Sequence, residues 1–209
     1  SFEKSFALIG ESGSGKSLTL KALLGMLPQE LDSLLEYDAS YALKRGQSIA
    51  FVPQNPFTAL SPLTKIEKQF MASREQAQKY LRMVDLEIDF LGRFPSELSG
   101  GQLQRLIIAM ALSIEPRLLL LDEPTTALDE ESKTTVLDLI GALQHECGFD
   151  LLFVTHDIQS IEGICEEVGI LNNGIMVERG LAQQVLQQPQ HTYTKELLEA
   201  GFKQRSFRA

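Results

Sequence analysis

The stretch that most constrains the fold of this chain is the octapeptide Gly-Glu-Ser-Gly-Ser-Gly-Lys-Ser at residues 10–17. It follows a short apolar run, residues 6–9, and precedes a run of helical character that begins at Leu18. This order of strand, glycine-rich loop and helix is the context in which the pattern G-x-x-x-x-G-K-[ST] binds phosphate. The glycines let the backbone curve closely around an anion, because no Cβ atom stands in the way.

The chemistry of this loop predicts a nucleotide phosphate as its ligand. Successive backbone N–H groups point inward as an anion-binding nest, and the following helix adds its positive dipole. We expect the Lys16 ammonium to reach the β- and γ-phosphates and the Ser17 hydroxyl to bind Mg²⁺. The alternative is a flexible linker between a strand and a helix, and the flanking elements favour the phosphate loop. The predicted nucleotide-binding residues of the loop are Gly10, Glu11, Ser12, Gly13, Ser14, Gly15, Lys16, Ser17 and Leu18.

Composition limits the class of protein. The 209 residues are 44% apolar and 22% charged, which is typical of one soluble globular domain. The net charge of −9 argues against a nucleic-acid-binding surface. No apolar run approaches the roughly 18 residues that span a bilayer, and no signal peptide is visible. The sequence starts at Ser1, directly before a strand, so we expect its N-terminal part to be truncated.

The two cysteines, Cys147 and Cys165, belong to no C-x-x-C motif or Cys/His cluster, so the sequence predicts no zinc site. Cys165 shares the apolar face of an expected helix with Ile158 and Ile161. We therefore expect a reduced, buried thiol at this position, which favours a reducing compartment.

Apolar runs and helical periods alternate along the chain, which predicts a mostly parallel sheet with helices on both faces. The expected strands are 6–9, 48–52, 117–121 and 150–155, and the expected helices include 16–27, 106–114 and 158–167. A hairpin is predicted at Asn173-Gly174, and two helices separated by Pro189 follow it. Ser73 and Gln76 predict a capping box.

We expect a single domain over residues 1–209. Its predicted core comprises residues 1–55 and 115–180, its helical subdomain residues 56–114, and its helical tail residues 181–209.

Polar residues follow three of the expected strands, at the position where α/β proteins place their chemistry. Asp122 and Glu123 end the strand 117–121, where one carboxylate can bind Mg²⁺ and the other can activate water. Gln54 and His156 follow two further strands and could contact the metal and the γ-phosphate. Taken singly, each has a structural alternative: an acidic turn, a solvated amide or a hydrogen-bonded histidine.

The pentapeptide Leu-Ser-Gly-Gly-Gln at residues 98–102 is the most informative further motif. Ser99 and Gln102 predict a capping box, but two glycines inside the first helical turn cost about 1 kcal/mol each relative to alanine. Gly100 and Gly101 are explained if a phosphate approaches bare N–H groups at this helix end. The loop at 10–17 already suits the β- and γ-phosphates of a nucleotide bound by this chain. The N–H groups at residues 98–102 would therefore bind a nucleotide held by another subunit.

Together these motifs resemble the ATP-binding cassette of ABC transporters. Residues 10–17 resemble the Walker A loop, Gln54 the Q-loop, residues 98–102 the signature motif and residues 118–123 the Walker B strand. The motifs occur in the family's order and extend from residue 10 to about residue 180. The resemblance implies a P-loop NTPase fold with a helical signature subdomain and a small β-hairpin.

The resemblance also implies a chemistry. Asp129 matches the D-loop aspartate, which contacts nucleotide, and His156 matches the switch histidine. The chain would bind ATP and Mg²⁺ and hydrolyse ATP, with Glu123, His156 and Lys16 as catalytic residues. The implied Mg²⁺ ligands are Ser17, Gln54 and Asp122.

A narrower resemblance points to the dipeptide, oligopeptide and nickel importer class, and to the first of its two paired ATPases. It rests on residues 10–19, 24–28, 54–62 and 190–198, although Thr192 stands where that class usually has proline. The implied partners are a second ATPase subunit, two transmembrane permease subunits and, indirectly, a substrate-binding protein. The implied location is peripheral, on the cytoplasmic face of the inner membrane. Nickel and peptide both remain open as cargo.

The loop 57–62 and the helical patch after it would dock on the permease in such a transporter; a self-packed helical lobe is the alternative. Two family features are not found in the sequence. Phe2 and Phe6 lie too close to the loop to be the adenine-stacking aromatic, and the cysteine-bearing C-terminal extension is missing, so no iron–sulfur role is supported.

Two other functions use a similar cassette. A DNA-repair or chromosome-structuring ATPase would carry a long coiled coil between residues 17 and 98, and that interval is short and lacks sustained heptads. A regulatory cassette would bind ATP without turnover. The sequence argues against it through four residues, Lys16, Asp122, Glu123 and His156.

Overall fold

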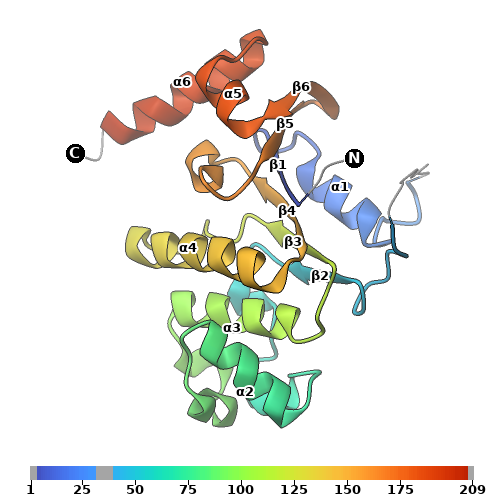
Figure 1. Ribbon diagram of the computed structural model, residues 1–209, viewed down its shortest axis with the longest axis vertical. Coiled ribbons are helices and arrows are strands. Elements are labelled where there is room, and N and C mark those ends of the chain that lie inside the picture. The colour runs from blue at the N-terminus through green and yellow to red at the C-terminus, as the bar shows by residue number, and fades with distance from the viewer. Residues whose placement is uncertain (1–3, 32–39, 207–209) are drawn as a thin grey trace. The chain divides into compact units, whose positions relative to one another are not determined.

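A computed structural model describes residues 4–31 and 40–206 of the chain (Figure 1). The chain divides into two compact units. One comprises residues 1–40 and 150–209, and the other comprises residues 41–149. The expected helical subdomain, residues 56–114, lies within the second unit, while the single-domain boundaries stay a prediction.

The described residues of the first unit form four neighbouring strands in the order β4-β1-β5-β6. Their bounds are Ser5–Ile9 for β1, Asp150–Thr155 for β4, Glu167–Asn172 for β5 and Ile175–Leu181 for β6. Strand β1 pairs in parallel with both β4 and β5, and β6 is antiparallel to β5. All five residues of β1 are buried, because the strand is central in this unit and covered on both faces.

The predicted hairpin at Asn173-Gly174 is confirmed. It joins β5 to β6 through a turn in which Asn173 has φ 47° and Gly174 has φ 79°. Positive φ at both central residues is the geometry of a type I′ turn, whose twist matches that of the flanking strands.

The first helix of this unit, α1, spans Lys16–Leu23 and is shorter than the predicted 16–27. Gly25 has φ 62°, and the N–H of Gly25 donates to Ala22 O while that of Met26 donates to Lys21 O. These two bonds form a Schellman motif, which ends the helix before Pro28.

The predicted helix over residues 158–167 is wrong. A single 3₁₀ turn, η5, spans Ile158–Ile161, and β5 already begins at Glu167. The Asp157 carboxylate accepts the Gln159 N–H at 3.0 Å, and Gly163 then has φ 78°, so the chain turns back to the sheet at once. Cys165 is nevertheless buried, as predicted.

The tail forms two helices around Pro189, as expected. Helix α5 spans Ala182–Gln187 and helix α6 spans Thr192–Ser206. Helix α5 contacts β6, and Figure 1 shows α6 leading from there to the C-terminus.

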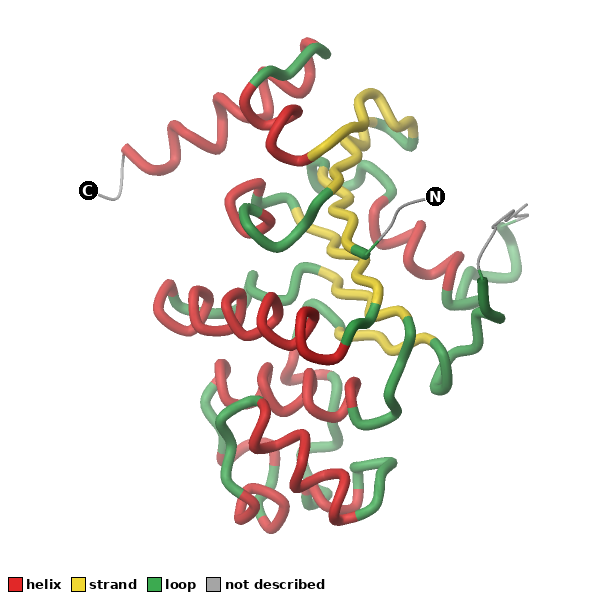
Figure 2. Tube along the Cα trace, in the orientation of Figure 1, coloured by secondary structure: helices red, strands yellow, loops and turns green. Residues whose placement is uncertain are grey.

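The second unit combines two parallel strands with a group of helices. Strand β2 spans Ile49–Val52 and β3 spans Leu118–Asp122, and these residues confirm the two predicted buried strands. Helices α2 (Arg74–Met83) and α4 (Glu130–Cys147) both pack on α3 (Gly100–Leu112), as Figure 2 shows in red. Helix α3 is enclosed by its neighbours, and its residues 106–112 are apolar on nearly every face.

Short 3₁₀ turns connect these elements at Pro56–Thr58 (η1), Ile66–Lys68 (η2), Ile88–Gly92 (η3) and Pro95–Glu97 (η4). Both predicted capping boxes are formed. The Ser73 hydroxyl accepts the Gln76 N–H at 3.2 Å, and the Ser99 hydroxyl accepts the Gln102 N–H at 3.3 Å. Within residues 4–31 and 40–206, no helix has the length and apolar content that crossing a membrane requires.

The two cysteines should differ sharply in reactivity. Cys147 is exposed, whereas burial raises the pKa of the Cys165 thiol to about 12. Thiolate is the reactive species, so Cys165 should resist alkylation in the folded protein at pH 8. We expect mass spectrometry to find one alkylated cysteine in the native chain and two after denaturation. A Cys147→Ser variant should remain unlabelled until it is denatured; rapid native labelling of that variant would contradict the burial of Cys165.

Candidate functional site

The predicted phosphate loop connects β1 to α1 in the first unit, as the sequence pattern requires. Gly13 has φ 83° and Gly15 has φ 105°, which are left-handed conformations that side-chain-bearing residues rarely adopt. A Cβ atom at Gly13 would meet nothing within 4 Å, so this part of the loop faces open space. The loop therefore has the backbone shape and the approach that an anion needs.

The β5–β6 hairpin supports the loop from one side. A Cβ atom at Gly10 would lie 2.3 Å from the carbonyl oxygen of Leu171 in β5, so glycine is required at this position. The Gly174 N–H, in the hairpin turn, donates to the carbonyl oxygen of Ser14 at 2.9 Å. Sequence reasoning identified the turn but not its contact with the loop.

Lys16 is held inside the loop. Its side chain is buried, and its ammonium donates to the carbonyl oxygens of Gly10 at 2.8 Å and Glu11 at 2.9 Å. Burying a cation is costly unless hydrogen bonds compensate it, and these carbonyls supply that compensation. The arrangement places a positive charge at the centre of the loop.

The hydroxyl of Ser14 is a second indication of a ligand. Ser14 is buried, and its Oγ atom has no hydrogen-bond partner among the residues that the structure describes. Buried hydroxyls normally have partners, so an unpaired one calls for an explanation. A phosphate oxygen in the loop would accept this hydroxyl proton, and the residues present therefore fit a nucleotide phosphate.

His156, which was also predicted to be a site residue, lies in the first unit at the same edge of the sheet as the phosphate loop. Ile9 of β1 pairs in parallel register with Thr155 of β4, so the phosphate loop and His156 follow neighbouring strand ends. His156 is exposed, and the turn after it is fixed by the Thr155 hydroxyl, which accepts the Asp157 N–H at 2.9 Å. Exposed residues of the loop and of the first turn of α1 are Glu11, Ser12, Ser17 and Leu18.

In the second unit the structure brings Gln54 and Glu123 together. Val52 of β2 pairs with Leu121 of β3, so the residues after both strands emerge side by side. The Gln54 amide donates to Glu123 Oε2 at 3.0 Å, and the Thr126 hydroxyl donates to the same oxygen at 3.1 Å. Thr126 was missed by sequence reasoning, because a threonine three residues after a glutamate carries no distinctive signal.

Glu123 is also conformationally unusual. Its φ of 46° lies in the left-handed region, which costs a non-glycine residue about 1–3 kcal/mol. Such strain persists only where the surroundings fix the residue, and it is frequent at functional sites. Asp122 precedes it at the half-buried end of β3.

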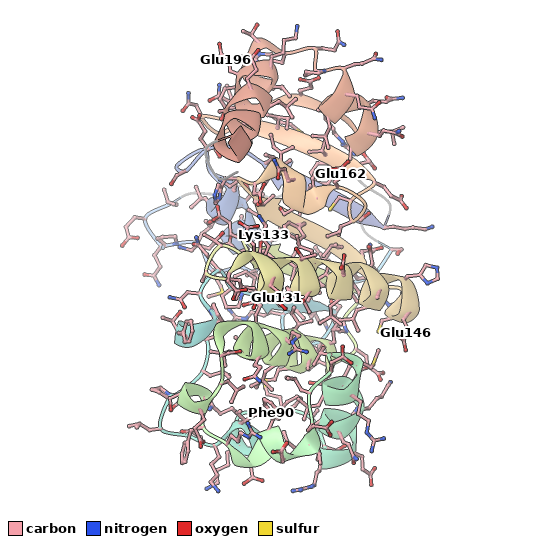
Figure 3. All side chains as sticks on the ribbon, turned by 90° about the vertical axis from the view of Figure 1, so that its left-hand side faces the viewer. Phe90, Glu131, Lys133, Glu146, Glu162 and Glu196 are labelled. Carbon is pink, nitrogen blue, oxygen red and sulfur yellow. The ribbon has the colours of Figure 1, made fainter. Side chains whose placement is uncertain are left out.

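Asp129 caps helix α4. Its Oδ1 accepts the Ser132 N–H at 2.9 Å, and this hydrogen bond lowers the pKa of the Asp129 carboxyl below its ordinary value. Figure 3 labels Glu131 and Lys133 just beyond it, near the start of the helix. The capping role accounts for an aspartate here, while the predicted contact between Asp129 and nucleotide stays a prediction.

The two signature glycines differ in their surroundings. A Cβ atom at Gly101 would lie 2.8 Å from the Ser132 hydroxyl, so packing against α4 already requires glycine there. A Cβ atom at Gly100 would make only ordinary contacts, the nearest 3.5 Å from Leu128. Packing therefore explains Gly101 but leaves Gly100 for another explanation, such as close approach of a ligand to the backbone.

The predicted Mg²⁺ ligands are the oxygens of a hydroxyl, an amide and a carboxylate, at Ser17, Gln54 and Asp122. No group of three His, Cys, Asp or Glu side chains within residues 4–31 and 40–206 could hold a metal ion. Mg²⁺ is commonly bound by one or two protein oxygens together with waters and substrate phosphates. Hydroxyl, amide and carboxylate oxygens suit Mg²⁺ of that kind, and the assignment of these three residues to one ion stays a prediction.

Comparison with known proteins adds a family match. A family model described as ABC transporter matches residues 3–126. Among curated relatives, the dipeptide transport ATP-binding protein DppF of Haemophilus influenzae is 36% identical, covering 94% of this chain and 66% of its own. The peptidoglycan transport ATP-binding protein YejF of Agrobacterium fabrum is 37% identical, covering 93% of this chain and 40% of its own.

The glutathione import ATP-binding protein GsiA of Escherichia coli is 38% identical, covering 94% of this chain and 37% of its own. The chain thus spans between about two fifths and two thirds of the length of these curated relatives.

Solved structures agree with the predicted fold class. The ATP-binding cassette MJ0796, solved as a dimer in a post-hydrolysis state bound to ADP and Pi, has a TM-score of 0.69 and 29% identity, covering 86% of this chain and 85% of its own. A putative metal-chelate type ABC transporter in an inward-facing conformation has a TM-score of 0.71 and 27% identity. The match covers 96% of this chain and 79% of the transporter's chain. The expected α/β cassette fold is confirmed.

Substituting the signature glycines one at a time should separate packing from ligand approach. Gly101→Ala should lower the free energy of unfolding by about 1–3 kcal/mol, because the new methyl group collides with Ser132. Gly100→Ala should leave it unchanged or raise it by up to about 1 kcal/mol, since the site has room. Urea denaturation measures both. The added change Ser132→Gly should rescue the Gly101 variant, and equal losses at the two positions would contradict the account.

Proposed function

The chain belongs to the ABC transporter family, and we propose that it is the ATP-binding and ATP-hydrolysing subunit of a bacterial importer. The proposed cargo is a peptide or nickel, and the names of the relatives, which include dipeptide and glutathione transport, favour a peptide. The proposal rests on finding two features in one chain. One is a phosphate loop with the buried Lys16, and the other is the strained Glu123, whose carboxylate accepts two hydrogen bonds.

Phosphate binding is assigned to the first unit. The N–H groups of the loop, the Lys16 ammonium and the Ser14 hydroxyl would bind the phosphate oxygens of ATP. Mg²⁺, bound by Ser17, Gln54 and Asp122, would neutralise charge on the β- and γ-phosphates. Since the Gln54 amide nitrogen already donates to Glu123, its carbonyl oxygen is the atom for the cation.

Hydrolysis is assigned to Glu123. Its carboxylate would accept a proton from water as the water oxygen bonds to the γ-phosphorus, and the bond from that phosphorus to the β–γ bridging oxygen breaks. The products are ADP and phosphate. The donors Gln54 and Thr126 both bind Oε2 and would hold the carboxylate in one orientation. His156 would hydrogen-bond the γ-phosphate, and Asp129 would contact nucleotide across a dimer.

Two kinds of partner are proposed. A second ATPase subunit would bring its own nucleotide to the signature residues Ser99, Gly100, Gly101 and Gln102, and the room around Gly100 supports such an approach. A pair of membrane permeases would dock on the second unit, where large apolar side chains are exposed. These exposed side chains are Phe57, Leu63, Met71 and Phe94. In this role the chain would lie at the cytoplasmic face of the inner membrane, with a substrate-binding protein acting through the permeases.

The proposed role of Glu123 predicts a binding-competent but inactive variant. Glu123→Gln keeps the shape of the side chain but removes its basicity, so ATP hydrolysis should fall by about a hundredfold or more. The variant should still bind ATP and accumulate as a dimer, with itself or with its paired ATPase, because the nucleotide is no longer consumed. Phosphate release and size-exclusion chromatography with light scattering measure the two effects.

A matched control is Glu162→Gln, which removes one carboxylate at an exposed position of the first unit that Figure 3 labels. That variant should hydrolyse ATP as the unmodified chain does. Normal turnover in the Glu123→Gln variant would exclude Glu123 as the base. Failure of the unmodified chain, supplied with its partner subunits, to release any phosphate would contradict the proposed function itself.

A further inference from the structure

The C-terminal helix α6 contacts the phosphate loop through the side chain of Tyr193. The backbone N–H of Glu11 donates to the Tyr193 hydroxyl oxygen at 3.3 Å. Both residues belong to the same compact unit, although 182 positions separate them in the sequence. Tyr193 is half-buried at this contact.

The peptide that Tyr193 contacts is also the one that holds Lys16. The N–H of Glu11 and the carbonyl of Gly10 belong to one planar peptide unit. The carbonyl accepts the Lys16 ammonium at 2.8 Å, while the N–H donates to Tyr193. Because the unit is planar, rotating it would disturb both hydrogen bonds together, and polarisation along the series strengthens each of them.

Tyr193 lies in the first turn of α6, and hydrogen bonds around the start of this helix hold it in place. The Glu178 carboxylate, on β6, accepts the N–H groups of Gln190 at 2.8 Å and His191 at 3.0 Å. The imidazole Nδ1 of His191 accepts the Tyr193 N–H at 3.2 Å, which caps the helix. The start of α6 is therefore fixed to the sheet immediately before the residue that contacts the loop.

Helix α6 also contacts the segment that follows His156. It packs on the 3₁₀ turn η5, and Leu197 and Leu198 of α6 are buried. Glu196, labelled in Figure 3, lies between Tyr193 and this buried pair along the helix and is exposed. One face of α6 thus rests on the unit while its start contacts the loop.

We propose that Tyr193 is a positioning residue for the phosphate loop: its hydroxyl fixes the Gly10–Glu11 peptide and, through it, the Lys16 ammonium that binds ATP. This inference rests on the proposed function, because it assigns Lys16 to ATP. It gives the tail a role in nucleotide affinity. Any event that displaces the start of α6 weakens ATP binding without touching the nucleotide.

The experiment removes one oxygen atom. Tyr193→Phe keeps the aromatic ring and its packing but cannot accept the Glu11 N–H. Losing one hydrogen bond of this kind should weaken Mg²⁺-ATP binding about fivefold. Calorimetric titration of the whole chain measures the affinity directly, and steady-state phosphate release gives KM and kcat. We expect KM to rise in the same proportion, with kcat nearly unchanged.

The matched control is Tyr80→Phe, which removes a tyrosine hydroxyl that donates to Glu115 at 3.1 Å in the other unit. It should leave the ATP affinity unchanged. If Tyr193 only packs the tail, Tyr193→Phe keeps that packing, and the ATP affinity and KM would stay at their original values. That result would overturn the inference.

The outcomes for the inference and for the proposed function are distinct. Unaltered affinity in Tyr193→Phe, beside an unmodified chain that hydrolyses ATP, overturns the role of Tyr193 alone. If the unmodified chain binds ATP without hydrolysing it, the titration still tests Tyr193 while the proposed ATPase function fails. An unmodified chain that binds no ATP overturns both.

Discussion

The interaction on which the rest of the site depends is the burial of the Lys16 ammonium against the carbonyls of Gly10 and Glu11. A cation in a glycine-rich loop is stable there only if the backbone is held with its oxygens turned toward it. The hairpin turn provides one support through the Gly174 N–H, and Tyr193 provides another through the Glu11 N–H. The loop is thus a local sequence motif whose shape is fixed by segments distant in the chain.

The second unit applies a similar device to a negative charge. Glu123 has a strained backbone, and its carboxylate is held by Gln54 and Thr126 from one side. Pre-oriented groups of this kind need little rearrangement during a reaction, which is the main way that proteins stabilise phosphoryl transfer. Backbone strain at Glu123 coincides with the proposed chemistry, and Asp85 and Glu115 also have positive φ. Packing alone explains Gly101, which avoids a collision with Ser132.

Sequence reasoning succeeded where the determinants are local. The phosphate loop, the Asn173-Gly174 turn and the two capping boxes each lie within a few residues and depend on special φ values or on short side chains. It failed where two local signals compete. Gly25 ended α1 before Pro28, and the turn after Asp157 replaced a helix whose apolar spacing looked regular. Contacts between distant segments, such as Tyr193 with Glu11, leave no trace in any window of sequence.

We propose that this chain recognises its ligand by the phosphates held in the loop. Parallel calorimetric titrations of the whole chain with Mg²⁺-ATP, Mg²⁺-tripolyphosphate and AMP test it most directly. We expect ATP and tripolyphosphate to bind, because both offer the β- and γ-type phosphates that Lys16 and the loop amides would bind, and we expect no detectable binding of AMP. Binding of AMP as tight as that of ATP, without binding of tripolyphosphate, would contradict it.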